Sequence, residues 1–165
     1  MYRTFLAAIA IFSTALALSA CAEPAEPAEP LAYNPSLTTY KSTTCGCCKL
    51  WVDYAQKTGF DIVAKDVDDL NGVKKQYGVK PRYQSCHTSV SKEGYVFEGH
   101  LPAKLIHRFL ENPPEGALGL AVPGMPLGSP GMEVGNRFTP YQVMQLNKDG
   151  SSVVYAEITS AEEQF

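Results

Sequence analysis

Residues 42–48 read Ser-Thr-Thr-Cys-Gly-Cys-Cys and join two segments of different periodicity. The segment before them, 37–40, is short and rich in residues that favour strands, whereas the apolar residues of 49–58 recur at helical spacing. Gly59 then provides a natural stop for a helix. The stretch therefore predicts a junction between a strand and a helix, with three cysteines at the start of the helix.

The segments that follow continue the alternation of strands and helices. Strands are predicted at 60–67, 86–90 and 95–98, and helices at 69–77 and 103–111. Residues 91–94, Ser-Lys-Glu-Gly, are a hairpin signal, and Pro102 suits the first turn of a helix. The resulting order, βαβαββα, is that of the thioredoxin-like fold and belongs to the α/β class.

The last part of the chain shows two further patterns. Residues 112–137 are dense in glycine and proline and have no regular periodicity, which predicts a long loop that is either functional or disordered. Residues 141–146 and 153–158 have strand-like patterns and are joined through Asn-Lys-Asp-Gly. They predict a C-terminal β-hairpin.

The N-terminus predicts export. Arg3 precedes an apolar run, 5–18, that is short for a bilayer span and typical of a signal peptide. Leu-Ser-Ala-Cys at 18–21 matches the cleavage box of bacterial lipoproteins, in which Cys21 is acylated; ordinary cleavage after Ala22 is the alternative. Three copies of Ala-Glu-Pro then form an extended tether. We expect a signal peptide in 1–21, a linker in 22–36 and a metal-binding domain in 37–165.

Length and charge narrow the range of partners. The 165 residues, 45% of them hydrophobic, suffice for one core. A formal net charge of −3 without a basic stripe gives no reason to expect nucleic acid as a partner. The membrane contact that we expect is the lipid anchor at Cys21, on the periplasmic side of the envelope. Ala22 favours the outer membrane.

Cys45, Cys47 and Cys48 carry the predicted chemistry. Amides at a helix N-terminus favour the thiolate form, and three thiolates within four residues can hold a soft ion such as Cu(I). Cys45 and Cys48 also have the spacing of a redox dithiol, for which Cys47 is not needed. Cysteines so close together cannot link distant segments, which favours metal or redox chemistry over structural disulfides.

Three further side chains are candidates because the predicted fold brings them near the start of this helix. Cys86 comes just before the third strand and would supply a fourth thiolate. His87, the next residue in the strand, would point to the face of the sheet opposite to Cys86 unless the backbone bulges. Packing or hydrogen bonding is therefore the alternative to metal ligation for His87. His100 lies at the entrance of helix 103–111, where a neutral imidazole is a suitable copper ligand.

Met125 and Met132 belong to the glycine-rich loop rather than to an apolar stripe. A thioether on such a loop can cap a Cu(I) centre, and filling an apolar gap is the alternative. His107, in contrast, shares the polar side of its predicted helix. We therefore expect His107 to face solvent.

Several of these motifs occur together in one known family. From about 38 to 158 the chain resembles the CopG-type periplasmic copper-resistance proteins, a thioredoxin-like family long classed as a domain of unknown function. The resemblance rests on Cys45-Gly46-Cys47-Cys48 with Trp51, Ser85-Cys86-His87-Thr88, Glu98-Gly99-His100-Leu101-Pro102-Ala103, residues 119–126 and Met132-Glu133. Several separate motifs in the same order make this resemblance more specific than any one of them.

The resemblance implies copper resistance, with Cu(I) bound by the cysteines in a multinuclear cluster and with interconversion of Cu(I) and Cu(II). Two alternatives stay open. One is a metal-independent thiol-disulfide oxidoreductase, in which Cys45 attacks and Cys48 resolves the mixed disulfide. The other is a chaperone that passes copper to an efflux pump or oxidase. Cys47 and Cys86 favour metal binding, because plain disulfide exchange needs neither.

Overall fold

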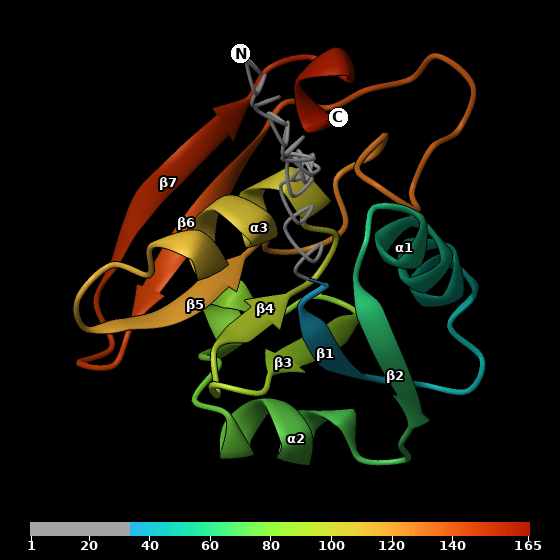
Figure 1. Cartoon of the computed structure of the whole chain (residues 1–165). Coiled ribbons are helices and arrows are strands. Elements are labelled where there is room, and N and C mark those ends of the chain that lie inside the picture. Colours follow the sequence, from blue (N-terminus) through green and yellow to red (C-terminus); the bar gives the residue numbers. More distant parts are fainter. Residues whose placement is uncertain (1–33) are drawn as a thin grey trace, which may run out of the picture. The chain divides into compact units, whose positions relative to one another are not determined.

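Two strand–helix units come first, followed by two strands and a helix, and then by three strands and a short 3-10 turn (Figure 1). The computed structural model describes residues 34–165. The predicted signal peptide, Cys21 and most of the predicted linker lie outside the described residues. Within 34–165, no helix has the length and apolar character needed to cross a membrane.

The elements of the described part are as follows. The helices are α1 (Gly46–Lys57), α2 (Leu70–Gln76) and α3 (Ala103–Glu111), with short 3-10 turns η1 (Pro81–Tyr83) and η2 (Glu162–Gln164). The strands are β1 (Ser36–Lys41), β2 (Asp61–Asp66), β3 (His87–Ser91), β4 (Val96–Glu98), β5 (Ala117–Ala121), β6 (Tyr141–Asn147) and β7 (Ser152–Ile158).

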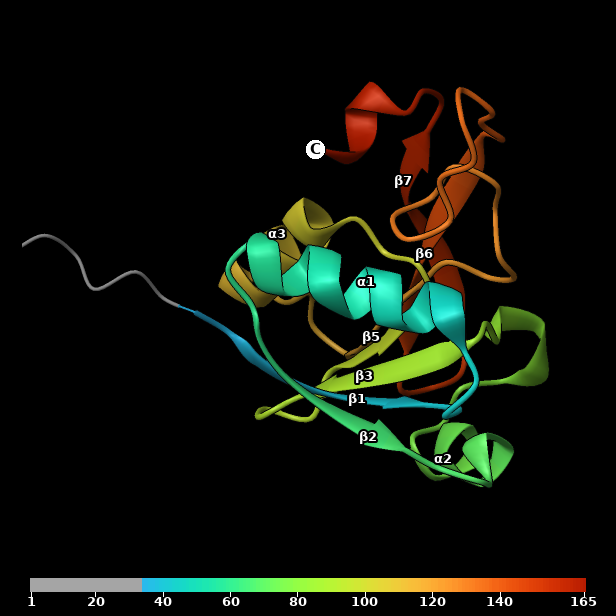
Figure 2. The same cartoon turned by 90° about the vertical axis from the view of Figure 1, so that its right-hand side faces the viewer.

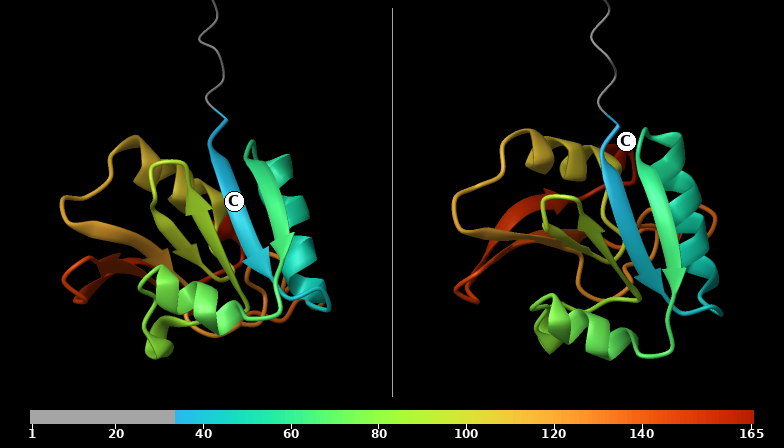
Figure 3. Two further views of the ribbon diagram at one scale, coloured as in Figure 1. Left: turned by 90° about the horizontal axis from the view of Figure 1, so that it is seen from below. Right: turned by 60° about the horizontal axis from the view of Figure 1, so that its bottom comes forward.

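One sheet contains these seven strands, in the order β2-β1-β3-β4-β5-β6-β7. β1 is parallel to β2 and β4 is parallel to β5, and the other neighbours are antiparallel. Figure 3 shows β1 and β2 side by side with their arrows pointing the same way. The α/β class, the predicted order of elements up to α3 and the C-terminal hairpin of β6 and β7 are confirmed.

The helices lie on both faces of the sheet, with α1 and α3 on one face and α2 on the other (Figure 2). Successive side chains of a strand point to opposite faces. Phe97 of β4 therefore joins the core under α1 and α3, with Trp51 and Phe109, whereas Val96 packs beside Tyr83 on the α2 side. Burial of each large side chain stabilises the fold by about 1.5–3 kcal/mol.

The segment 112–137 is not the continuous loop that the sequence predicted. It contains β5, which pairs with β4 and β6 and so joins the terminal hairpin to the rest of the sheet. Four of the five residues of β5 are buried, and a strand buried on both faces shows no alternation of apolar and polar residues. Gly119 is required in β5 because a Cβ atom there would lie 1.7 Å from the Val96 carbonyl oxygen.

Contacts with the C-terminus and with α1 help to hold the loop after β5 in place. Gln164, near the C-terminus, is buried and donates a hydrogen bond of 2.9 Å to the Gly128 carbonyl, and it accepts one from the Tyr141 hydroxyl. Gly131 packs on the start of α1, and a Cβ atom on Gly131 would lie 2.7 Å from the backbone nitrogen of Trp51. The loop therefore runs past the start of α1.

One end of the sheet gathers the predicted site. β1 ends at Lys41, which pairs with His87 at the start of the antiparallel strand β3, and the chain then leads to Cys45. β4 ends at Glu98, which pairs with Thr88. The chain leads from there into His100. Segments that are far apart in the sequence therefore meet beside the N-terminus of α1.

Candidate metal centre

Four cysteine sulfurs gather at the start of α1. The Sγ atom of Cys47 lies 3.6 Å from that of Cys45 and 3.9 Å from that of Cys86. Cys45 and Cys48 form a disulfide, whereas Cys47 and Cys86 are free thiols. All four sulfurs lie within 4.8 Å of one another. We call these four residues the sulfur group, and Cys86 lies in it as the sequence predicted.

The local sequence explains why the sulfurs meet the positive end of the helix. Cys45 is the residue before the first turn, in an extended conformation, and its side chain makes no capping hydrogen bond. The first turn also contains no acidic residue. The partial positive charge of the helix start is therefore not neutralised by a carboxylate, and it faces the sulfurs directly.

Cys86 also belongs to a second cluster, which it forms with His87 and His100. Its Sγ atom lies 2.9 Å from Nε2 of His100 and 3.4 Å from Nδ1 of His87. We call these three residues the imidazole group. Because Cys86 is common to both groups, a cation bound at either one contacts the same sulfur.

The Pro130 carbonyl determines the tautomer of His100. His100 is fully buried, and its Nδ1 lies 2.7 Å from the Pro130 oxygen, which can only accept a hydrogen bond. Nδ1 therefore carries the proton, and Nε2, beside Cys86, keeps its lone pair. Metal-binding histidines are commonly oriented in this way. No sequence pattern marks Pro130 for this role, because every residue offers a carbonyl.

His87 lies closer to the site than strand alternation predicted. β3 begins at His87, so Cys86 precedes the strand and the two side chains are not forced to opposite faces. The imidazole packs on Trp51, with ring centroids 4.5 Å apart. Its Nε2 is buried and has no hydrogen-bond partner within 34–165. Packing on Trp51 therefore leaves one ring nitrogen unexplained, and such unpaired buried atoms are rare.

Burial sets the charge of these groups. Desolvation, followed by the charges of His100 and Lys74, lowers the pKa of His87 well below its usual 6.5, and burial also lowers the pKa of His100. Burial and the neighbouring Cys47 raise the pKa of Cys86 to about 12. Without a metal, the imidazole group is therefore neutral at pH 7, with a protonated Cys86 and free lone pairs on the imidazoles.

The two methionines occupy different positions on the loop that borders the site. Met125 is 54% exposed and follows Gly124, whose N–H donates to the Gln84 carbonyl just before Cys86. Met132 is half-buried, one residue after the glycine that packs on α1. The exposure of Met125 does not fit a residue that fills an apolar gap.

His107 is not the solvent-facing residue that the sequence predicted. It is half-buried, stacks on Phe60 with ring centroids 4.1 Å apart, and lies 3.1 Å from the Thr58 carbonyl through Nε2. The prediction failed because it considered only the face of α3 and not the end of α1. His107 belongs to neither of the two groups.

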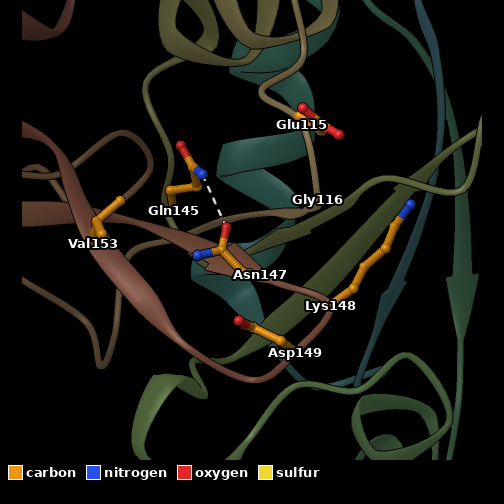
Figure 4. Close-up of a pocket in the computed structure, with 7 residues that line it drawn as sticks. All are labelled: Glu115, Gly116, Gln145, Asn147, Lys148, Asp149 and Val153. Atoms are coloured by element: carbon orange, nitrogen blue, oxygen red, sulfur yellow. Dashed lines mark hydrogen bonds between the residues drawn. The ribbon is translucent and has the colours of Figure 1, made fainter.

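A hollow of about 410 Å³ lies elsewhere, around the turn between β6 and β7 (Figure 4). The residues that line it are mostly of polar types and of mixed charge: Glu115, Gly116, Gln145, Asn147, Lys148, Asp149 and Val153. No cysteine, histidine or methionine lines it. The chemistry of the two groups around Cys86 therefore makes them the candidate site.

Known proteins are similar to this chain in the region of the candidate site. A family model described as "Protein of unknown function, DUF411" matches residues 83–132, which include Cys86, His87, His100, Met125 and Met132. No curated protein matches the chain. Two solved structures of a copper resistance protein CopG, in forms 2 and 1, are each 39% identical to this chain.

The similarity to these two structures extends over most of the chain. It covers 76% of this chain and 99% and 98% of the solved chains, with TM-scores of 0.72 and 0.71. Because the identity extends over this much of both chains, the similarity covers the whole domain and not one motif. The chain therefore belongs to the CopG family of copper resistance proteins.

Proposed function

We propose that this protein binds Cu(I) in the bacterial envelope and acts in copper resistance. One observation carries the proposal: three other sulfurs and two imidazoles surround the Cys86 sulfur, and the ligand atoms of each group lie within 4.8 Å of one another. Neither group contains a carboxylate. Thiolate and imidazole ligands select copper and other soft or borderline ions over magnesium or calcium.

The shared position of Cys86 supports a centre with more than one copper. A thiolate sulfur can bridge two ions, and Cys86 lies between ligands of two kinds. The sulfur group suits Cu(I), whereas one cysteine with two histidines is a donor set that also accommodates Cu(II). Both oxidation states therefore have suitable ligands around one sulfur, which supports interconversion of Cu(I) and Cu(II).

Met125 and Met132 are secondary candidates in this proposal. Both lie on the loop that runs past the start of α1, and Pro130 of the same loop orients His100. A thioether from this loop would complete the coordination of Cu(I) on its exposed side.

We assign the domain to the thioredoxin-like class. The strand order β2-β1-β3-β4 supports this assignment, as does the pair Cys45 and Cys48 at the start of α1. The same pair favours one other function, disulfide exchange without metal. That function does not account for Cys47, Cys86 and the unpaired nitrogen of His87.

The location is part of the proposal and rests on the sequence. A signal peptide with an acylated Cys21 would hold the domain on the periplasmic side of the envelope through the Ala-Glu-Pro linker. Labelling of cells with radioactive palmitate tests it. The full-length chain should take up label and the Cys21→Ser variant should not.

Anaerobic titration of the reduced protein with Cu(I) tests the copper function. Bound copper per chain is counted by elemental analysis for the unaltered protein, Cys47→Ser and Cys86→Ser, with Cys21→Ser as the matched control. We expect more than one copper per chain in the unaltered protein and the control, and loss of most of it in the other two. Negligible binding, together with disulfide exchange that survives Cys47→Ser, would establish the oxidoreductase instead.

A further inference from the structure

A buried charged network lies directly behind the Cys86 segment. Lys74 of α2 and Glu98 of β4 are 2% and 0% exposed, and their charged atoms Nζ and Oε1 lie 2.5 Å apart. Thr88 of β3 donates a hydrogen bond of 2.6 Å to Oε2 of Glu98 and lies 3.0 Å from Nζ of Lys74. The network links α2, β3 and β4.

The network also reaches the peptide that leads into Cys86. The backbone N–H of Ser85 donates a hydrogen bond of 2.6 Å to Oε1 of Glu98. On its other side, the Ser85 hydroxyl bonds to the Gly124 carbonyl. A Cβ atom on Gly99 would lie 2.6 Å from the Ser85 side chain, so Gly99 leaves the room that Ser85 occupies. The residue before Cys86 is therefore held on three sides.

Stability alone is a poor explanation for such a network. Desolvation of two charges is unfavourable by several kcal/mol, and replacing a buried ion pair with apolar residues is often neutral or stabilising. In some proteins a buried ion pair instead selects one arrangement of the chain. Here the selected arrangement brings the Cys86 sulfur within 2.9 Å of His100 and 3.9 Å of Cys47.

We infer that Glu98 is a positioning residue: its carboxylate, paired with Lys74, accepts from the Ser85 N–H and so holds the Cys86 sulfur within reach of both Cys47 and His100. The consequence for copper rests on the proposed function. The placement of the sulfur does not depend on copper, so it can be measured separately.

Two double variants isolate the contact to the Ser85 N–H. Lys74→Met with Glu98→Gln removes both charges but keeps an oxygen that can accept from this N–H. Lys74→Met with Glu98→Met removes the charges and the acceptor at similar side-chain volume. We call the two the Gln variant and the Met variant, after the residue at position 98. Thr88→Val is the matched control, because it changes the network and leaves the Ser85 contact in place.

Copper content, the near-ultraviolet thiolate-to-Cu(I) absorption and thermal unfolding are measured for each variant. The Gln variant and Thr88→Val should keep the copper content and spectrum of the unaltered protein. The Met variant, while folded, should fall to the content of Cys86→Ser. The inference is wrong if the folded Met variant matches the unaltered protein, or if the Gln variant loses as much copper as the Met variant.

A measurement without copper separates this inference from the proposed function. Oxidation of the metal-free protein with diamide should link Cys47 to Cys86, and mass spectrometry of peptides gives the rate. We expect at least a tenfold lower rate in the Met variant than in the Gln variant, whether or not copper binds. Equal rates contradict the positioning role. If the Met variant does not fold, Ser85→Pro replaces it, because it removes the same N–H and leaves the ion pair; Ser85→Ala, which removes only the hydroxyl, is then its control.

Discussion

The two sides of the site are built in different ways. Three members of the sulfur group, Cys45, Cys47 and Cys48, come from one turn at the start of α1, and two of them can form or lose a disulfide. The imidazole group adds two histidines to Cys86, and both are fully buried. His87 begins β3, and His100 lies at the entrance of α3. The sulfur side can therefore change its number of ligands, whereas the imidazole side is fixed by packing.

This difference assigns separate tasks to the two sides. Under the proposed function, the sulfur group would set how much Cu(I) the protein can hold, because opening the disulfide raises its free thiols from two to four. In the same proposal the imidazole group would supply neutral nitrogen ligands, whose orientation is set by burial and by the Pro130 carbonyl. Cys86 is the one residue common to both groups, so in the proposed copper centre it would join the two sides.

Reduction of the disulfide between Cys45 and Cys48 should have the largest effect. The reduced protein should bind Cu(I) at least about a hundredfold more tightly than the oxidised protein, which corresponds to about 2.7 kcal/mol. Competition with a chromogenic Cu(I) chelator measures the difference. In the double variant Cys45→Ser with Cys48→Ser, the reductant should make no difference. Equal affinity of the oxidised and reduced proteins would mean that these two cysteines do not bind copper.

Removal of one imidazole should have a smaller effect. His100→Gln should weaken copper binding by at least about tenfold, since even the loss of outer partners of metal ligands weakens binding by about 10- to 100-fold. His107→Gln is the matched control, because His107 also lies beside a backbone carbonyl but outside the site. The same chelator competition applies. Similar losses in both variants would show a general effect of histidine removal rather than ligation.

Much of the fold could be predicted from the sequence, because helical and strand periodicities report burial on one face. β5 could not, since most of its residues are buried and Gly119 interrupts any pattern. The cysteines at the start of α1 were recognisable because they are contiguous. The contact between Cys86 and His87 depends on β3 starting one residue later than the pattern indicated.

The supporting residues of the site were the least predictable. Lys74 lies on a short helix among other polar residues, and nothing in its neighbourhood marks it as buried. Glu98 offered a clearer signal, because it is a charged residue directly after Val96 and Phe97 and just before Gly99. A charge at the end of an apolar strand needs a partner, but the sequence does not say which of the lysines supplies it.

Copper binding should release a proton from Cys86. Its pKa of about 12 means that the thiol is protonated at pH 7, so a copper ion must displace that proton. For this one proton, affinity should rise by up to about tenfold per pH unit from pH 6 to 8. Calorimetry in buffers of different ionisation enthalpy counts the protons released. Cys86→Ser should release fewer protons per copper, and an unchanged count would contradict the assignment.

The smallest effect should be a loss of stability in acid. The pKa of His87 is lowered in the folded state, so below pH 6.5 the unfolded chain takes up a proton that the folded chain does not. Stability should therefore fall as the pH falls from 6.5, by up to about 1.4 kcal/mol per pH unit for this group. Urea unfolding of the metal-free protein between pH 5 and 7 measures the slope. His87→Leu should reduce the slope, whereas an unchanged slope would mean that His87 is not buried in its neutral form.

X-ray absorption at the copper edge of the reduced, Cu(I)-loaded protein identifies the atoms that bind copper. We expect a first shell dominated by sulfur, a smaller nitrogen contribution that His100→Gln removes, and a copper–copper distance that Cys86→Ser abolishes. A first shell of nitrogen and oxygen without sulfur, unchanged in Cys86→Ser, would contradict copper binding by the sulfur group.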